Sequence, residues 1–259
     1  MKTPTRSRIL EIIERLGSRR PAELAQDLRI TPQAVHRHLK SLLSDGALES
    51  RGRGPLTRYA LAGVPQLAGA EDWYRSQSEP AGAPGETACE TRDVFAARQA
   101  RMAELARSGV PEDELALVIA VAGEIGNNCF DHNLGHWRDI PGCWFETQLT
   151  GALLWICIAD RGQGVFRSLS RAHPGIADER SALVAAFEKK ISGRAPESRG
   201  NGLKFVRSVV TAGDKRGLAC RSGGALAAYG ALGSRCARHL SRWTPNAGGT
   251  ATLLAWRLA

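Results

Sequence analysis

The sequence contains no segment that is long and apolar enough to cross a membrane. Its longest apolar run, from Ala152 to Ala159, is far below the roughly 20 residues that a membrane-spanning helix needs. Charged residues interrupt the first apolar stretch of the chain, which excludes a signal peptide. We therefore expect a soluble, cytoplasmic protein without a membrane partner.

Paired cysteine ligands are also absent. The chain has six cysteines and six histidines, but no C-x-x-C pair and no Cys/His spacing typical of a metal site. We expect the cysteines to be reduced and mostly buried as small apolar residues. They are Cys89, Cys129, Cys143, Cys157, Cys220 and Cys236. No internal repeat is present either.

The amount and the position of charge distinguish the N-terminal quarter from the rest of the chain. The 259 residues suffice for one large or two modest domains, and the formal net charge is +9. Residues 1–62 contain 12 Lys or Arg against 6 Asp or Glu, so they carry most of the excess. A basic balance of this kind favours an acidic partner such as nucleic acid.

Three short helices are predicted at the N-terminus. Residues 5–16 repeat apolar side chains at helical spacing, and the segment PAELAQDL, which begins with a proline, predicts a second helix. After a three-residue turn, Thr31 is a natural N-cap and Pro32 a natural first residue for a third helix, PQAVHRHLKSLLSDG. Its apolar residues, which we expect to be buried, are Val35, Leu39 and Leu42.

The next segment, ALESRGRGPLTRYAL, is predicted to form two strands around a basic, Gly-rich turn, which is the pattern of a wing. Residues 5–62 closely resemble the winged helix-turn-helix domains of bacterial transcription regulators. The resemblance implies that the third helix enters the major groove of double-stranded DNA and that the wing lies near the phosphate backbone. The expected DNA contacts are Thr31, Gln33, His36, Arg37, Lys40, Arg51, Arg53 and Arg58.

Two other interpretations of this segment are weaker. Trihelical units of this type also serve as protein-docking modules, but the concentration of basic charge favours DNA. His36 and His38 have no partnering metal ligands nearby, so a role on the helix face is expected for them. Winged-helix proteins usually meet DNA as dimers, and a homodimer is expected by analogy.

A linker or irregular arm is predicted for residues 63–92, where the composition changes to Gly, Pro, Ala, Ser and Glu. The aromatic pair Trp73 and Tyr74 indicates that part of this arm packs on a neighbouring domain or on another subunit.

Residues 93–259 are expected to form an α+β domain in which a mixed sheet is covered by helices. Helices are predicted over 93–107, 111–132 and 178–192, and the runs WFETQLT and ALLWICIA are typical of paired strands. The C-terminal third consists of short apolar runs separated by Gly, which favours further strands.

Three polar segments in this domain indicate a nucleotide site in combination, although each alone is typical of an ordinary turn or solvated helix face. The first, GEIGNNCFDHN, places carboxylate and amide side chains on one helix face, at Glu124, Asn127, Asn128 and Asp131. The apolar residues on the opposite face are Val118, Val121, Ile125 and Cys129. The second segment, ADRGQGV, follows a buried strand, and the third, RGNGL, opens a helix.

The order E-x-x-x-N, D-x-G-x-G and G-x-G-L resembles the N, G1 and G2 boxes of the GHKL ATP-binding fold. Gyrases, mismatch-repair ATPases, histidine kinases and anti-sigma-factor kinases share that fold. The resemblance covers roughly residues 110–258 and implies an α/β sandwich with ATP and Mg²⁺ as cofactors. Residues 165–199, between G1 and G2, correspond to the ATP lid. Cys129 stands where this superfamily usually has Ala.

The chemistry of the boxes is consistent with these roles. Asp160 can accept a hydrogen bond from the adenine amine, and Gly162 and Gly164 let the backbone approach the ring. Asn128 can supply an oxygen to Mg²⁺. Glu124, one turn earlier, is placed to act as a general base toward the γ-phosphate.

The G2 box completes the expected ATP site. Gly200 and Gly202 offer backbone N–H groups and a helix dipole to phosphates, and Arg199 or Lys204 adds positive charge there. Asp131 and Leu203 are the remaining expected contacts.

We therefore predict an ATP-binding, DNA-binding transcriptional regulator in which Mg-ATP occupancy modulates the winged helix. The N box, E-x-x-N-N-x-x-D-H, resembles that of anti-sigma-kinase-like ATPases, in particular bacterial proteins that join such a domain to a winged helix. The alternatives are an anti-sigma-type serine/threonine kinase that acts on a small partner protein, and a slow ATPase. No helix with a phosphoacceptor histidine precedes the N box, so a sensor histidine kinase is not expected.

Overall fold

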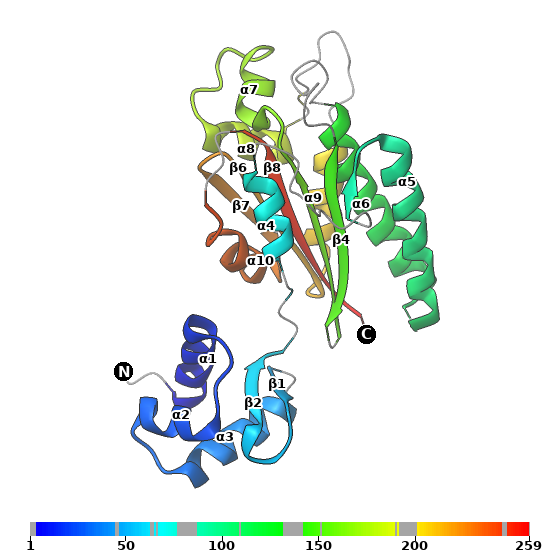
Figure 1. The fold of residues 1–259 in the computed structure, drawn as a ribbon. Helices are drawn as coiled ribbons and strands as arrows, with labels where there is room; N and C mark the ends of the chain where they lie inside the picture. The colour runs from blue at the N-terminus through cyan, green and yellow to red at the C-terminus, as the bar shows by residue number, and fades with distance from the viewer. Residues whose placement is uncertain are drawn as a thin grey trace. The chain divides into compact units, whose positions relative to one another are not determined.

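A computed structural model describes residues 4–44, 47–62, 65, 67–76, 87–108, 110–131, 142–150, 152–189, 191, 201–244 and 248–258. The chain divides into two compact units (Figure 1), the first comprising residues 1–65 and 149–152 and the second residues 66–148 and 153–259.

The first unit is a trihelical bundle followed by a two-stranded wing. Its helices are α1 (Thr5–Leu16), α2 (Pro21–Leu28) and α3 (Pro32–Ser44). The wing pairs β1 (Leu48–Arg51) antiparallel with β2 (Arg58–Leu61) around a short 3-10 helix, Gly54–Leu56. The helices predicted at 5–16 and in PAELAQDL are confirmed. The third is confirmed from Pro32 to Ser44, and its last two expected residues lie outside the described ranges.

The core of this unit is built from the apolar positions that the helical spacing predicts. Val35, Leu39 and Leu42 are buried, as are Ile9 and Ile13 of α1. The wing is fastened to the turn between α1 and α2 by two backbone hydrogen bonds, from Arg19 N to Tyr59 O at 2.9 Å and from Tyr59 N to Arg19 O at 2.7 Å. The strand β2 therefore has hydrogen-bond partners on both of its edges.

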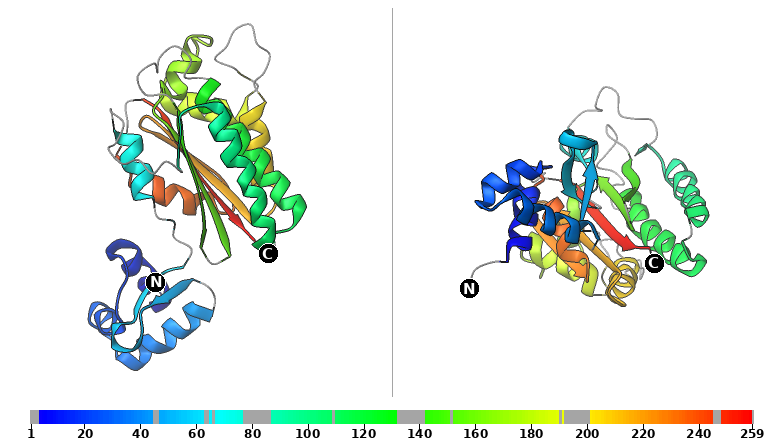
Figure 2. Two further views of the ribbon diagram at one scale, coloured as in Figure 1. Left: turned by 45° about the vertical axis from the view of Figure 1, so that its right-hand side comes forward. Right: turned by 90° about the horizontal axis from the view of Figure 1, so that it is seen from below.

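The second unit is a six-stranded sheet with helices on both faces (Figures 1 and 2). The strand order is β3-β4-β5-β8-β6-β7, with bounds Ala88–Cys89, Cys143–Thr150, Leu153–Asp160, Thr250–Arg257, Arg216–Ser222 and Ala225–Gly230 in that order. The described ladders β3–β4, β5–β8, β8–β6 and β6–β7 are all antiparallel. The sequence led us to expect a mixed sheet, and this expectation is corrected to an antiparallel one. The central strand β8 runs opposite to both of its neighbours, β5 and β6.

The helices α5, α6, α8 and α9 lie on one face of the sheet, and α4 and α10 lie on the other (Figure 2). Their bounds are α4 Ala68–Arg75, α5 Arg92–Ala100, α6 Glu112–Asp131, α8 Glu179–Glu188, α9 Gly202–Thr211 and α10 Gly233–Leu240. The short helix α7, Gly164–Ser170, follows β5, and a 3-10 helix, Arg101–Ser108, follows α5. The helix predicted over 93–107 therefore continues beyond Ala100 in the tighter 3-10 form.

The arm expected at residues 63–92 contributes both α4 and the edge strand β3 to this unit. Trp73 and Tyr74 of α4 are buried. The ring of Trp73 lies 6.2 Å from that of Trp144, and the ring of Tyr74 lies 5.6 Å from that of Trp243. These aromatic contacts hold the short helix against the sheet.

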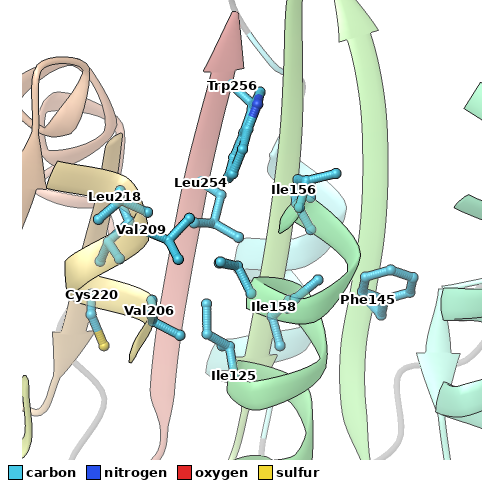
Figure 3. Packing of buried hydrophobic residues seen from close by; sticks show 14 of the residues in the cluster. Ile125, Phe145, Ile156, Ile158, Val206, Val209, Leu218, Cys220, Leu254 and Trp256 are labelled. Carbon is cyan, nitrogen blue, oxygen red and sulfur yellow. The ribbon is translucent and has the colours of Figure 1, made fainter. Parts of the chain in front are cut away.

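The alternation of β5 decides which way its last residue points. Leu154, Ile156 and Ile158 face the cluster that contains α6 and α9 (Figure 3), whereas the odd-numbered residues face α4 and α10. Since successive side chains of a strand point to opposite faces, Asp160 continues the even series. Its carboxylate therefore lies on the face of the sheet that α6 and α9 cover.

The orientation of α6 is fixed by a polar cluster near its N-terminal end. Glu114 accepts a hydrogen bond from the indole Nε1 of Trp256 at 2.6 Å and another from the Arg216 guanidinium at 2.5 Å. The guanidinium of Arg216 lies 4.5 Å from the centroid of the Trp256 ring. The carboxylate of one helix is thus bonded to side chains from β8 and β6.

Gly126 lets α6 approach α5 closely, and its replacement by Ala is expected to destabilise the second unit. An added Cβ would overlap the ring of Phe95, which is 1% exposed and packs edge-on against Phe145 at 5.2 Å. We expect the free energy of unfolding to fall by about 1–3 kcal/mol, because overpacking a core forces side chains and backbone to shift.

Urea unfolding followed by tryptophan fluorescence tests this prediction, since residues 1–65 contain no tryptophan. The matched control is Gly175→Ala, where an added Cβ meets no heavy atom within 4 Å. The control should change stability by less than about 0.5 kcal/mol. Equal stabilities of the two variants would contradict the packing described here.

Candidate functional site

The third helix of the first unit presents a polar outer face. Gln33, His36, Arg37 and Lys40 are exposed, opposite the buried apolar residues of α3. Thr31 is the N-cap that the sequence predicts, since its Oγ1 accepts a hydrogen bond from the backbone N–H of Ala34 at 3.3 Å. This face carries three basic or imidazole side chains and one amide, which suits contacts with phosphates and base edges.

The wing arginines have different surroundings. Arg53 is exposed at the tip. Arg58 donates to the carbonyl oxygen of Ser18 at 3.0 Å and lies 3.6 Å from the Glu23 carboxylate. The hydrogen bond from the backbone N–H of Arg20, aided by the charge of Arg58, lowers the pKa of Glu23. Arg58 therefore fastens the wing to the bundle. The side chain of Arg51 lies outside the described residues.

At the end of β5, Asp160 is buried with only 4% of its surface exposed. Its Oδ1 accepts a hydrogen bond from the backbone N–H of Gly162 at 2.7 Å, and its Oδ2 accepts one from the hydroxyl of Thr250. A buried carboxylate is costly unless hydrogen-bonded, and these two donors stabilise it. When it is ionised, this carboxylate can only accept hydrogen bonds.

The turn after Asp160 is held by residues from the ends of β6 and β8. Ser222 Oγ accepts a hydrogen bond from the backbone N–H of Val165 at 2.9 Å and donates to the carbonyl oxygen of Gly249 at 3.4 Å. Gly164 and Gly249 have φ angles of 75° and 81°, a region that favours glycine. A Cβ at Gly249 would also overlap the carbonyl oxygen of Asp160. The glycines therefore let three backbone segments meet at this end of the sheet.

The helix α6, which carries the segment GEIGNNCFDHN, contacts the other two polar segments. Its predicted buried face is confirmed, with Val118, Val121, Ile125 and Cys129 in the core. On the opposite side Glu124 is exposed, and Asn127 and Asn128 are half-buried.

Two contacts relate α6 to the other motifs. A Cβ added at Gly202, the first residue of α9, would overlap the carboxylate of Glu124. One turn further along α6, the Cys129 thiol lies beside the Asp160 carboxylate. Its hydrogen bond with the Cys143 thiol lowers the pKa of Cys129, but burial and the charge of Asp160 raise it above the usual value on balance. Glu124 and Cys129 therefore bring the three motifs to one end of the sheet.

The G2 segment is described from Asn201 onward. Asn201 precedes α9 without a capping hydrogen bond from its side chain, so it satisfies none of the amides of the first turn. Leu203 and Lys204 are half-buried in that turn. Arg199 and Gly200, which the sequence also assigns to the site, lie outside the described residues.

Asp131 has a partner within the protein. Its carboxylate forms an ion pair with Arg92 at the start of α5. The last turn of α6 is thereby joined to α5, and this carboxylate is engaged in a structural contact instead of being directed only toward a ligand.

Thr250 and Ser222 are two site residues that the motif analysis missed. Thr250 lies opposite Asp160 in the β5–β8 ladder, and Ser222 lies opposite Thr250 on the next strand, where its hydroxyl holds the turn after Asp160. The sequence carries one signal for the first of them, the Gly-Gly-Thr segment at 248–250 directly before the last apolar run. Nothing local distinguishes Ser222 from an ordinary strand residue.

The segment between G1 and G2 contains a packed helix, α8. The Asp178 carboxylate caps it by accepting a hydrogen bond from the backbone N–H of Ser181 at 2.6 Å, which lowers the pKa of Asp178. The Glu179 carboxylate accepts another from the backbone N–H of Gly224 at 2.7 Å. Leu183 and Phe187 are buried in the main core. Much of the expected lid is therefore part of the folded unit.

Two classes of feature are not found in the described part of the chain. Among those residues, no helix has both the length and the apolar character to span a bilayer. In the same residues, no three or more His, Cys, Asp or Glu side chains are grouped so as to hold a metal ion.

Comparison with known proteins bears on the first unit. Residues 3–50 match the family model described as bacterial regulatory protein, arsR family. The match includes α1, α2, α3 and most of β1. No curated protein and no solved structure matches the chain. The N-terminal unit is the helix-turn-helix DNA-binding domain of a transcription regulator.

Proposed function

We propose that the second unit binds Mg-ATP and that its occupancy changes the affinity of the first unit for DNA. The observation that carries this proposal is the meeting of three motifs at one end of the sheet. Asp160 ends β5 and Gly162 follows it. On α6, Glu124 lies against Gly202 and Cys129 lies beside Asp160. The half-buried Asn128 lies between Glu124 and Cys129 in the sequence of this helix. These are the residues that the GHKL resemblance assigns to a nucleotide.

The donor and acceptor set suits an adenine nucleotide. Asp160 is buried at the end of β5, and an ionised carboxylate is an acceptor that suits the exocyclic amine of adenine. The first turn of α9 offers backbone amides and a favourable dipole to phosphates. Asn128 is the residue that would hold Mg²⁺, a hard cation that binds oxygen ligands and neutralises phosphate charge. Lys204 adds positive charge in the same turn.

In the DNA-binding unit, we assign base reading to the exposed face of α3. Gln33 and Arg37 have side chains that form paired hydrogen bonds with adenine and guanine edges, respectively. Lys40 and Arg53 are suited to phosphate contacts, because both are exposed and charged. We further propose that the protein binds DNA as a homodimer, since two half-sites double the contact surface.

The coupling energy available from ATP is sufficient for regulation. At a free ATP concentration of 100 times Kd, a conformation that binds ATP gains about 2.7 kcal/mol over one that does not. That difference shifts their ratio by about 100-fold. A modest bias between two conformations of the DNA-binding unit or of its dimer can therefore be reversed by nucleotide.

Fluorescence anisotropy with a DNA duplex selected in vitro by the full-length protein tests this function. We expect Mg-ATP to change the Kd for the duplex by at least about 5-fold, within the usual range of allosteric coupling. The affinity should also fall linearly with salt on a logarithmic scale, because bound phosphates release counterions. Equal affinities with and without Mg-ATP, in a protein shown to bind ATP, would contradict the coupling.

A further inference from the structure

Two cysteines face each other across the edge of the sheet. Cys89 on β3 and Cys143 on β4 are register partners in an antiparallel ladder. The side chains of directly opposed residues lie on the same face of the sheet. Directly opposed Cβ atoms in such a ladder lie about 4.5–5.5 Å apart, and a disulfide needs about 3.5–4.5 Å. The two ranges meet at about 4.5 Å, so a shift of the edge strand of about 1 Å would bring the Cβ atoms to the separation of a disulfide.

Cys89 is the member of this pair that favours the thiolate. The hydrogen bond with Cys143 and the positive charge of Arg98 lower the pKa of Cys89 below its usual value, although burial acts in the opposite direction. Arg98 Nη1 lies 3.4 Å from the sulfur and also donates to the carbonyl oxygen of Ala88 at 2.7 Å. Hydrogen bonds with neighbouring thiols raise the pKa of Cys143. The pair thus combines an attacking thiolate with a protonated neighbour.

Three other cysteines of the same unit have raised thiol pKa values and serve as a comparison for Cys89. Burial raises the pKa of Cys220 to about 12 and that of Cys236 to about 12, and burial also raises the pKa of Cys157. Buried thiols of this kind are inert. The distinction between Cys89 and these residues comes from its neighbours, Arg98 and Cys143.

The position of the pair at the sheet edge provides a route for a small oxidant. Cys89 is 1% exposed, but β3 has two residues and lies at the edge of the sheet, where β4 is its one partner among the described strands. Short edge pairings open locally at a small fraction of the global unfolding free energy. Within the described ranges no metal-holding group includes these thiols, so thiol oxidation suits them better than metal binding.

We propose that Cys89 and Cys143 form a reversible disulfide when the protein meets a peroxide. The Cys89 thiolate attacks one peroxide oxygen, the O–O bond breaks, and Cys89 becomes a sulfenic acid while hydroxide or alkoxide leaves and takes up a proton. The Cys143 sulfur then attacks the sulfenic sulfur, its proton passes to the departing hydroxyl, and water leaves as the S–S bond forms. The two thiols lose two electrons, which the peroxide accepts.

The test uses the full-length protein treated with hydrogen peroxide, followed by thiol blocking, counting of free thiols and peptide mapping by mass spectrometry. We expect a loss of two of the six thiols, a linked peptide pair containing Cys89 and Cys143, and recovery of both thiols with dithiothreitol. Cys89→Ser and Cys143→Ser should each abolish this link. Cys236→Ser is the matched control and should retain it.

Several results would overturn the proposal. They are the absence of the linked pair in the wild type, a predominant Cys129–Cys143 link, and an unchanged two-thiol loss in Cys89→Ser. Circular dichroism of the untreated variants checks their folding, and Cys89→Ala and Cys143→Ala provide second variants if either serine variant fails to fold. The linked peptide in wild-type protein is diagnostic whatever the stability of the variants.

Discussion

Asp160→Asn is expected to remove most of the increase in thermal stability that ATP gives to the wild-type protein. The wild-type carboxylate is buried and can only accept hydrogen bonds, whereas the amide of Asn brings an N–H₂ donor into the same place. If the N–H₂ group of the introduced Asn faced the adenine amine, two donors would oppose each other. If it faced Gly162 or Thr250 instead, that residue would lose its acceptor. Either arrangement leaves a buried polar group unsatisfied. Such a group costs about 1–3 kcal/mol.

The cost of an unsatisfied buried group sets the expected loss of ATP-dependent stabilisation in Asp160→Asn. A loss in the upper part of this range, about 2–3 kcal/mol, raises the Kd for ATP by about 30- to 150-fold. At an ATP concentration of 100 times the wild-type Kd, the stabilisation then falls from about 2.7 kcal/mol to below about 1 kcal/mol. Differential scanning fluorimetry with Mg-ATP, Mg-ADP and no nucleotide measures the change.

Asp214→Asn is the matched control, because it makes the same charge change at an exposed turn before β6. It should keep the full ATP-dependent shift. Asp160→Asn also weakens the hydrogen bonds to Gly162 and Thr250, so its melting temperature without nucleotide should fall, and the comparison is made between the shifts. A folded Asp160→Asn protein with the full wild-type shift would exclude Asp160 from the nucleotide site.

Glu124→Gln is expected to abolish phosphate release, if the wild type hydrolyses ATP, while ATP binding persists. Gln matches Glu in shape but cannot take a proton from an attacking water, and general base catalysis contributes about 10²- to 10⁴-fold to such reactions. Glu124 lies against the first residue of α9. Removing its negative charge there lessens repulsion of the phosphates, so affinity for ATP should stay the same or rise.

Phosphate release and the ATP-dependent thermal shift, measured on the same samples, separate the two effects. Glu112→Gln, in the exposed first turn of the same helix, is the matched control and should leave both unchanged. Turnover by Glu124→Gln at the wild-type rate would show that another group activates the water. If the wild type releases no phosphate, transfer of labelled phosphate to a co-purified protein would favour the kinase alternative.

The N-terminal unit could be predicted almost residue by residue because its signals are local. Helical spacing of apolar residues, Pro21, Pro32 and the Thr31 cap are all contained within one segment. The 3.6-residue period also identified the exposed face of α3. The hydrogen bond from Arg58 to the carbonyl oxygen of Ser18 was not predictable, because it depends on how the wing folds back on the helices.

The second unit was less predictable because several of its elements owe their structure to tertiary contacts. The helix α4 occurs in a Gly- and Pro-rich segment and is held by the burial of Trp73 and Tyr74. The strand β3 exists only as a partner of β4. The helices α7 and α10 were not predicted, and the latter is a basic segment whose inward face is Cys236 and Leu240.

The motifs themselves could be found in the sequence, but their geometry could not. Glu124 and Asp160 were identified by spacing and order. Thr250 and Ser222 become site residues only when β8 is inserted between β5 and β6, a pairing between segments that lie about 90 residues apart for Asp160 and Thr250. Strand order of this kind depends on the whole fold and leaves no local periodicity to read.

The central position of β8 has a consequence for synthesis on the ribosome. β8 is the last described strand to leave the exit tunnel, yet both β5 and β6 pair with it. Until residues 250–257 emerge, the nascent second unit has two half-sheets with unpaired inner edges, whereas the helix-turn-helix unit is complete long before. A premature stop ahead of Thr250 would therefore yield a product that retains the helix-turn-helix unit and lacks the strand that joins the two halves of the sheet.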